Sequence, residues 1–212
     1  TVSDLAGRTL SGQTIEAFLA SLSPYPIFSV GMNCAFGAPQ MKPFIERMGK
    51  IAPYYISAHP NAGLPNEMGA YDETPESMAP QIAEFIDEGL VNIIGGCCGT
   101  TPDFIARYAQ MAEGKKPHVV TQRPQYMWLS GLDLLQVDDH VHAPIDSSRF
   151  VNVGERCNVA GSRKFLRLIN EKSYEEALGI ARKQVADGAA VVDVNMDDGL
   201  LDAKAEMVNF LN

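Results

Sequence analysis

Short apolar segments alternate along this chain with amphipathic segments, and this alternation restricts the fold more than any other feature of the sequence. The expected strands cover residues 26–31, 54–57 and 90–94, and the expected helices cover residues 14–22, 39–49, 75–89 and 102–114. Strands that are apolar at nearly every position are typical of parallel sheets with helices on the outside. The sequence therefore predicts an α/β fold built on a parallel sheet.

The starts of two expected helices carry the same signal, a Thr-Pro pair at residues 74–75 and again at residues 101–102. A threonine side chain can accept a hydrogen bond from the free N–H groups of the first turn, and proline at the first helical position has no N–H to lose. Gly89 and Gly114 then stand where these helices should end. Only about three and a half strand–helix units precede Gly114, so this part would be the second half of a barrel that needs roughly 250 residues.

A second strand–helix series begins after residue 148. Its expected elements are a strand over residues 149–156, helices over residues 163–171 and 173–188, and a strand over residues 189–197. Ser173 and Glu176 have the spacing of a capping box at the start of the second helix. The chain begins at Thr1 without methionine and stops within an expected helix, so we expect both ends to be cut from a longer chain.

Residues 116–148 show neither a helical nor a strand period and are expected to be a linker. Their apolar side chains predict that the linker packs on its neighbours; these are Trp128, Leu129, Leu132, Leu134 and Leu135. His140 and His142 have a spacing that could chelate a metal, but no third ligand is nearby, and a solvated linker is the favoured interpretation. His59, just past a strand, is interpreted as a turn residue without a metal role.

Three cysteines stand at the ends of expected strands. Cys97 and Cys98 follow the strand at residues 90–94 between glycines, and Cys34 follows the strand at residues 26–31. Adjacent cysteines do not easily form a disulfide with each other, but both can reach one soft metal ion. Three thiolates at strand ends describe an open zinc site, with the fourth position left for a substrate. Cys157 lacks metal-ligand spacing and is interpreted as a small buried apolar residue.

Composition narrows the class of protein. A net charge of −9 and the lack of a basic run argue against a nucleic-acid partner. No apolar run approaches the roughly 20 residues that cross a bilayer, and no signal peptide is recognisable. Four cysteines without paired spacing suit a reducing compartment, where thiols serve metals or catalysis rather than disulfides. The sequence therefore predicts a cytoplasmic enzyme without a membrane partner.

The strand at residues 189–197 separates polar from apolar side chains. Asp193, Asn195 and Asp197 share one face, and the alternate valines and Met196 share the other. A carboxylate in a parallel strand is costly to bury unless something pairs with it. A flat heterocycle with adjacent N–H donors, such as a pterin, would suit this face; an aspartate that caps the next loop is the alternative, and both remain open.

The segments at residues 31–34, 60–66 and 95–100 resemble the zinc signature of the homocysteine methyltransferase barrels. This resemblance implies that Cys34, Cys97 and Cys98 are zinc ligands and that the sulfur of homocysteine completes the tetrahedron.

The segments at residues 150–162 and 193–197 resemble the start of a methyltetrahydrofolate-binding barrel. This resemblance implies that Asn158, Asp193 and Asn195 face the pterin, with Asp193 at its N–H edge and Asn195 near the methyl-bearing nitrogen. The implied fold is two consecutive (β/α)8 TIM barrels, each only partly present. Residues 1–115 would be the C-terminal half of the first barrel, 116–148 the linker, and 149–212 the N-terminal part of the second.

The order of the two barrels resembles that of the cobalamin-dependent methionine synthases. It implies methyl transfer from 5-methyltetrahydrofolate through enzyme-bound cobalamin to zinc-activated homocysteine, with cobalamin-binding and activation domains elsewhere in the parent chain. The fragment alone is expected to be inactive. A cobalamin-independent homocysteine S-methyltransferase, using betaine or S-methylmethionine, would lack the second barrel. A structural zinc module would need a fourth protein ligand, and none stands at an obvious spacing.

Overall fold

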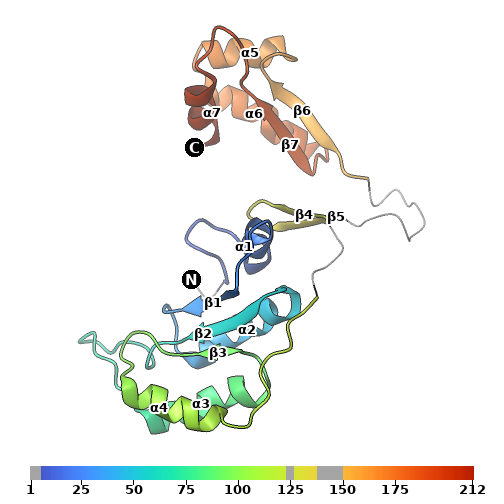
Figure 1. Ribbon diagram of the computed structural model, residues 1–212. Coiled ribbons are helices and arrows are strands. Elements are labelled where there is room, and N and C mark those ends of the chain that lie inside the picture. Colours follow the sequence, from blue (N-terminus) through green and yellow to red (C-terminus); the bar gives the residue numbers. More distant parts are fainter. Residues whose placement is uncertain (1–5, 123–126, 138–149) are drawn as a thin grey trace. The chain divides into compact units, whose positions relative to one another are not determined.

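The computed structural model describes residues 6–122, 127–137 and 150–212, and the chain divides into two compact units, residues 1–139 and 140–212 (Figure 1). His140 and His142 lie outside the described residues.

The first unit contains a parallel sheet with the strand order β1-β2-β3. Its strands are β1 (Ser29–Asn33), β2 (Tyr55–His59) and β3 (Ile93–Ile94). The helices that follow them are α2 (Ala38–Ile51), α3 (Pro75–Asp87) and α4 (Pro102–Ala112) (Figure 1). The predicted alternation is confirmed, although β1 and β2 each end two residues later than expected, at Asn33 and at His59, and β3 covers only the last two of its five expected residues.

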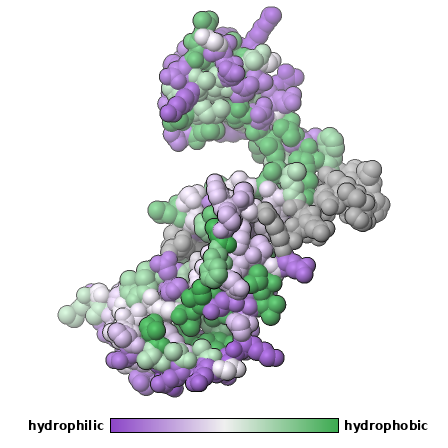
Figure 2. Space-filling view, viewed as in Figure 1, coloured by the Kyte–Doolittle hydropathy of each residue, from purple (hydrophilic) through white to green (hydrophobic). Residues whose placement is uncertain are grey.

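One face of this sheet forms the core of the first unit. Val30 and Met32 of β1 and Ile56 and Ala58 of β2 are buried in a single cluster with the apolar faces of the helices. The opposite surfaces of α3 and α4 are largely hydrophilic (Figure 2). This division explains why the helices are amphipathic, because each one buries a single face against the sheet.

The predicted start of α3 is confirmed in detail. The side chain of Thr74 accepts a hydrogen bond from the backbone N–H of Ser77, and the Ser77 hydroxyl accepts one from the N–H of Thr74. Helix α4 also begins at the predicted Thr-Pro pair, but Thr101 makes no side-chain cap hydrogen bond. Gly89 and Gly114 have φ values of 63° and 71°, the left-handed conformation that glycine adopts readily after a helix.

Part of the expected linker is an antiparallel hairpin of β4 (Met127–Ser130) and β5 (Leu134–Val137). It packs on α1 (Ile15–Leu22) and on the segment before that helix. The Ser130 hydroxyl donates to the carbonyl oxygen of Ala17 at 2.7 Å, and Arg8, ahead of α1, pairs with Asp133 at 2.9 Å. The prediction that this segment packs on its neighbours is confirmed. The prediction that it has no strand structure is wrong, because strands of four residues are too short to display a clear period.

The second unit contains two parallel strands, β6 (Val153–Asn158) and β7 (Val191–Asn195). Its helices are α5 (Arg163–Asn170), α6 (Tyr174–Ala186) and α7 (Ala203–Leu211). They bury a separate core cluster around Phe165, Leu168, Met196 and Phe210. The expected helices at residues 163–171 and 173–188 are confirmed to within two residues.

The predicted capping box at Ser173 is wrong. The Ser173 side chain makes no cap hydrogen bond, and its backbone, at φ −85° and ψ 61°, is not in the extended conformation of the capping residues Thr74 and Ser162. The preceding Lys172 has a φ of 58°, so the chain enters α6 through a left-handed residue. The tight connection from α5 to α6 thus overrides the local capping signal.

The mixed α/β fold with parallel sheets is confirmed, but neither sheet closes into a barrel within the described residues. The first parallel sheet has three strands and the second has two. No helix of the described residues combines the length and the apolar character that crossing a membrane requires.

Candidate functional site

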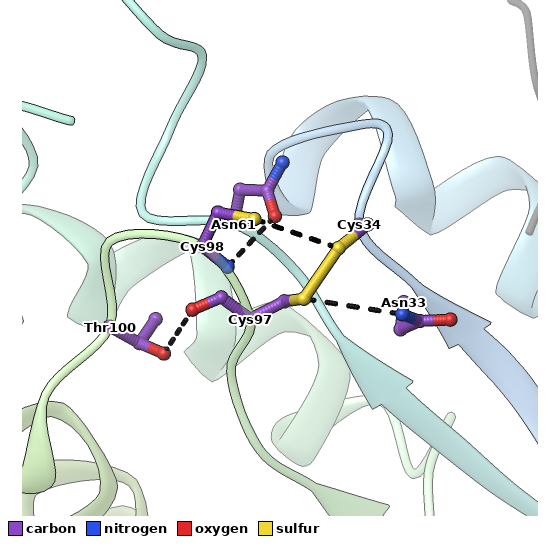
Figure 3. The surroundings of a disulfide bond; sticks show 6 residues. All are labelled: Asn33, Cys34, Asn61, Cys97, Cys98 and Thr100. Carbon is purple, nitrogen blue, oxygen red and sulfur yellow. Dashed lines mark hydrogen bonds between the residues drawn. A yellow bond between two sulfur atoms is a disulfide. The ribbon is translucent and has the colours of Figure 1, made fainter. Parts of the chain in front are cut away.

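The structure brings together the three cysteines that the sequence predicts to share a site. Cys34 follows β1, and Cys97 and Cys98 follow β3 (Figure 3). Their sulfur atoms all lie within 4.8 Å of one another, and the sulfurs of Cys34 and Cys98 are 3.7 Å apart. The carboxyl ends of two strands flanking β2 therefore deliver three sulfurs to one place.

Cys34 and Cys97 form a disulfide in this structure, whereas Cys98 is free and exposed (Figure 3). The sequence predicted thiols that serve a metal rather than a disulfide, so this pairing differs from the prediction. Its physical reason is that β1 and β3 both flank β2, which brings residues 63 positions apart in the chain to a Cα–Cα distance of 5.8 Å. That distance lies inside the range of about 4.4–6.8 Å that a disulfide allows.

The same three sulfurs fit a soft metal ion once the disulfide is reduced. A tetrahedral zinc site with Zn–S bonds of about 2.3 Å separates its sulfurs by about 3.8 Å. The distance of 3.7 Å between Cys34 and Cys98 already matches this separation. Within the described residues, the cluster contains no fourth His, Cys, Asp or Glu ligand. The donor set is therefore that of an open three-thiolate site.

The end of β2 and the start of the loop after it, residues 59–61, hold all three cysteines in place. Their carbonyl oxygens accept hydrogen bonds from the backbone N–H of Cys34 at 3.1 Å and of Cys97 at 3.0 Å. The side-chain oxygen of the buried Asn61 accepts one from the N–H of Cys98 at 3.1 Å (Figure 3). This bracing role of Asn61 was not predicted, although the residue lies in the segment 60–66 that carries the family resemblance.

Two side chains place hydrogen-bond donors beside the sulfurs. The amide nitrogen of Asn33 lies 4.0 Å from the sulfur of Cys97 (Figure 3). The side chain of Tyr71 forms a hydrogen bond with Cys98, and this hydrogen bond raises the pKa of the Tyr71 hydroxyl. A side chain at Gly99, whose φ is +80°, would collide with the ring of Tyr71. Sequence reasoning missed both donors, because nothing in their spacing links residues 33 and 71 to the cysteines.

The second unit brings together the three residues predicted to face a pterin. Asn158, at the end of β6, is the register partner of Asn195, at the end of β7. Asp193 lies two residues earlier on β7 and is exposed, so it shares the face of Asn195. Cys157 pairs with Val194, and both belong to the packed cluster on the other face. The predicted separation of polar and apolar faces is confirmed.

The amides at this edge also hold their own loops. The side-chain oxygen of Asn195 accepts a hydrogen bond from the N–H of Asp197 at 2.7 Å, and that of Asn158 accepts one from the N–H of Ala160 at 2.9 Å. These are the loop-capping contacts weighed as the alternative to ligand binding. Among the described residues, the carboxylate of Asp193 forms no hydrogen bond and no salt bridge. Asp193 is therefore the member of the set whose oxygens are available to a ligand.

Comparison with known families finds a match within each unit. Residues 1–112 match the homocysteine S-methyltransferase family, and residues 154–212 match the pterin binding enzymes. The first match contains the three clustered cysteines, and the second contains Asn158, Asp193 and Asn195. Both families have domains of the TIM-barrel type, and together they support methyl transfer that involves homocysteine and a folate. Because the first match covers more than half of the 212 residues, the chain belongs to the homocysteine S-methyltransferase family, and its residues 154–212 are similar to the pterin binding enzymes.

Proposed function

We propose that this chain is part of a cobalamin-dependent methionine synthase. In the proposed reaction, the methyl group of 5-methyltetrahydrofolate passes through enzyme-bound cobalamin to the sulfur of homocysteine, and methionine and tetrahydrofolate are the products. The observation that carries the proposal is the order of the two family matches on one chain, a homocysteine domain followed by a pterin-binding domain. Two substrate sites on separate domains suit a carrier that visits each in turn, which is the role proposed for cobalamin.

We assign one substrate to each of the predicted domains. Residues 1–115 would serve homocysteine and residues 149–212 the folate, with residues 116–148 between them. Cobalamin-binding and activation domains of the parent chain would be the partners.

In the proposed homocysteine site, reduced Cys34, Cys97 and Cys98 hold zinc. Zinc, when bound, lowers the pKa of the coordinated homocysteine thiol, so that a thiolate is present near neutral pH. The chain's own residues prepare this site. The segment at residues 59–61 fixes the backbone of the ligands, and the donors of Asn33 and Tyr71 offset part of the negative charge on the sulfurs.

In the proposed folate site, the carboxylate of Asp193 accepts hydrogen bonds from the N–H edge of the pterin. Asn158 and Asn195 lie beside it at the ends of β6 and β7. Their amide oxygens hold the local loops, which leaves the amide N–H groups to face the ring and the methyl-bearing nitrogen.

The zinc proposal is tested under reducing conditions in the complete enzyme, in which the first barrel is whole. We expect about one zinc per chain, as in three-thiolate catalytic sites, and one additional sulfur ligand in X-ray absorption spectra after homocysteine is added. The variant Cys157→Ser is the matched control, because Cys157 lies in the other unit and should leave zinc content unchanged. Four protein ligands before homocysteine is added, or zinc retained by the double variant Cys97→Ala, Cys98→Ala, would contradict the assignment.

Two other functions are less well supported. A cobalamin-independent methyltransferase that uses betaine or S-methylmethionine would share the cysteine cluster, but it leaves the pterin-binding match at residues 154–212 without a role. A structural zinc module would need a fourth protein ligand, and the described cluster consists of three cysteines.

A further inference from the structure

The pairing of β6 with β7 changes register in the middle of the strands. Gly154 pairs with Val192, and Cys157 pairs with Val194. The step from one pair to the next is three residues on β6 but only two on β7. Strand β6 therefore contains a β-bulge, one residue more than its partner.

The bulge decides which way the end of β6 faces. If pairing continued regularly from Gly154, Cys157 would stand opposite Asn195, and Asn158 would stand opposite Met196. Side chains alternate between the two faces of a strand, so a slip of one residue turns each of them to the other face. Without the bulge, Asn158 would point into the core beside Met196, and Cys157 would point to the polar face.

A side chain of α6 holds the bulge. The side-chain oxygen of Gln184 accepts a hydrogen bond from the backbone N–H of Arg156 at 2.8 Å, and its amide nitrogen lies 3.4 Å from the sulfur of Cys157. Arg156 lies inside the shifted segment, where a strand N–H loses its regular partner. Gln184 therefore supplies an acceptor at the point where the ladder is interrupted.

Gly154 makes room for this side chain. A Cβ atom built at Gly154 would lie 2.6 Å from the side-chain oxygen of Gln184 and 3.1 Å from its Cβ. Any larger residue at position 154 has to push the amide of Gln184 away from Arg156. Gly154 of β6 and Gln184 of α6 therefore act together to maintain the bulge.

We propose that Gln184 is a positioning residue of the folate site: by holding the β6 bulge, it turns Asn158 toward Asp193 and Asn195. The inference rests on the proposed function, which gives the shared face its role. Gln184 itself lies on the helix side of the strand and acts only through Asn158.

Thiol labelling of the reduced full chain tests the register directly. Cys157 is 0% exposed, and burial raises the pKa of its thiol, so it should react slowly with iodoacetamide. Loss of the hydrogen bonds in Gln184→Met should raise its labelling rate about tenfold, read for this residue by peptide mass spectrometry. Gly154→Ala, which displaces Gln184 without removing it, should do the same. Gln184→Glu keeps the acceptor for Arg156 and should label like the unaltered chain.

Other labelling outcomes would overturn the inference. Unchanged labelling in both Gln184→Met and Gly154→Ala would show that the bulge does not need the glutamine. Loss of the helical circular dichroism signal in Gln184→Met, with Gly154→Ala still protected, would show that Gln184 supports the whole unit rather than the register.

Folate affinity in the complete enzyme separates this inference from the proposed function. Asn158→Ala and Gln184→Met should both weaken 5-methyltetrahydrofolate binding by about tenfold. Gln184→Glu, which keeps the acceptor for Arg156, should bind 5-methyltetrahydrofolate like the unaltered enzyme. If Asn158→Ala leaves affinity unchanged, the proposed folate face is wrong, while labelling still decides the role of Gln184. If Asn158→Ala weakens binding and Gln184→Met does not, the positioning role is wrong.

Discussion

At the scale of single residues, two of the three sulfurs in the cysteine cluster each have a hydrogen-bond donor beside them, the hydroxyl of Tyr71 or the amide of Asn33. Each side chain directs a donor at one sulfur, Cys98 for Tyr71 and Cys97 for Asn33. Partners of this kind orient metal ligands and adjust the charge that they carry. The surroundings of the cluster therefore also influence the orientation and the charge of its sulfurs.

The variant Tyr71→Phe removes the hydroxyl and keeps the ring that packs on Gly99. We expect it to weaken zinc binding by the reduced chain about tenfold, because loss of a partner to a metal ligand commonly has an effect of this size. Competition with a chromophoric chelator measures the change. Tyr108→Phe is the matched control, because the Tyr108 hydroxyl bonds to the sulfur of Met78 in the helix core. Equal loss in both variants would contradict a specific role for Tyr71.

Substitution of Asp193 tests whether the polar face of β7 binds a ligand or only caps the next loop. In the complete enzyme, Asp193→Ala should weaken 5-methyltetrahydrofolate binding by about 1–3 kcal/mol, because the N–H groups of the pterin lose their acceptor. The melting temperature should change little, since this exposed carboxylate makes no hydrogen bond within the described residues. Asp187→Ala, at the exposed salt bridge with Lys183, should leave folate affinity unaltered. A collapse in stability with unchanged affinity per folded molecule would favour the cap.

At the scale of elements, the start of α6 shows how tertiary contacts replace a local signal. Ser173 makes no cap, and the residues on either side of it, Lys172 and Tyr174, instead bond to Glu206 of α7. Glu206 is 5% exposed, so its charge is buried among these partners. A carboxylate from a later helix thus secures the start of an earlier one.

The stability of the second unit should depend on pH through this contact. The hydrogen bonds from Lys172 and Tyr174 lower the pKa of Glu206 below its ordinary value of 4.5. A lowered folded-state pKa means that the stabilisation is complete above that ordinary value and is lost as the pH falls through the lower, folded-state pKa. The same carboxylate raises the pKa of Lys172, so the lysine's contribution is present below 10.5 and is lost only as the pH rises through its raised value.

Urea unfolding, followed by circular dichroism at a series of pH values, measures this dependence. We expect Glu206→Gln to lower the unfolding free energy at neutral pH and to remove part of the decline in acid. Glu175→Gln, at the exposed pair with Arg182, should change neither. An acid decline of the same size in Glu206→Gln would contradict the assignment.

At the scale of the whole molecule, the described sheets are open. Apolar side chains at the amino-terminal end of the first sheet remain in contact with solvent, with Phe28 72% and Tyr55 43% exposed. Unpaired strand edges and uncovered apolar surface favour association and partial order. Loops on an unclosed sheet also hold metal ligands less firmly than loops on a complete barrel.

We therefore expect this chain by itself not to sustain methionine synthesis. The assay combines the reduced chain with zinc, homocysteine, methylcobalamin and 5-methyltetrahydrofolate, and follows methionine against a control without protein. The double variant Cys97→Ala, Cys98→Ala sets the background for metal-dependent reaction. Repeated, zinc-dependent turnovers by the chain above that background would contradict the expectation.

Several features of the fold and the site were predictable because they depend on neighbours in the chain. The period of 2 in β7 correctly separates Asp193 and Asn195 from the core, and the Thr-Pro pair at residues 74–75 correctly starts α3. The placement of Cys34, Cys97 and Cys98 after apolar strands predicted their cluster, since parallel strands end at one edge of the sheet. The hairpin at residues 127–137 was missed, because strands of four residues have almost no period to detect.

Apart from the hairpin of β4 and β5, the sequence by itself determined the order of strands and helices, the face that each one buries, and the residue types at the strand ends. Only the tertiary structure decided that Cys34 pairs with Cys97, that Tyr71 reaches Cys98, and that Gln184 turns the end of β6. The physical reason is the separation along the chain over which each kind of interaction acts. Helix and strand periods act over a few residues, whereas these contacts join residues 63, 27 and 28 positions apart and exist only after the elements pack.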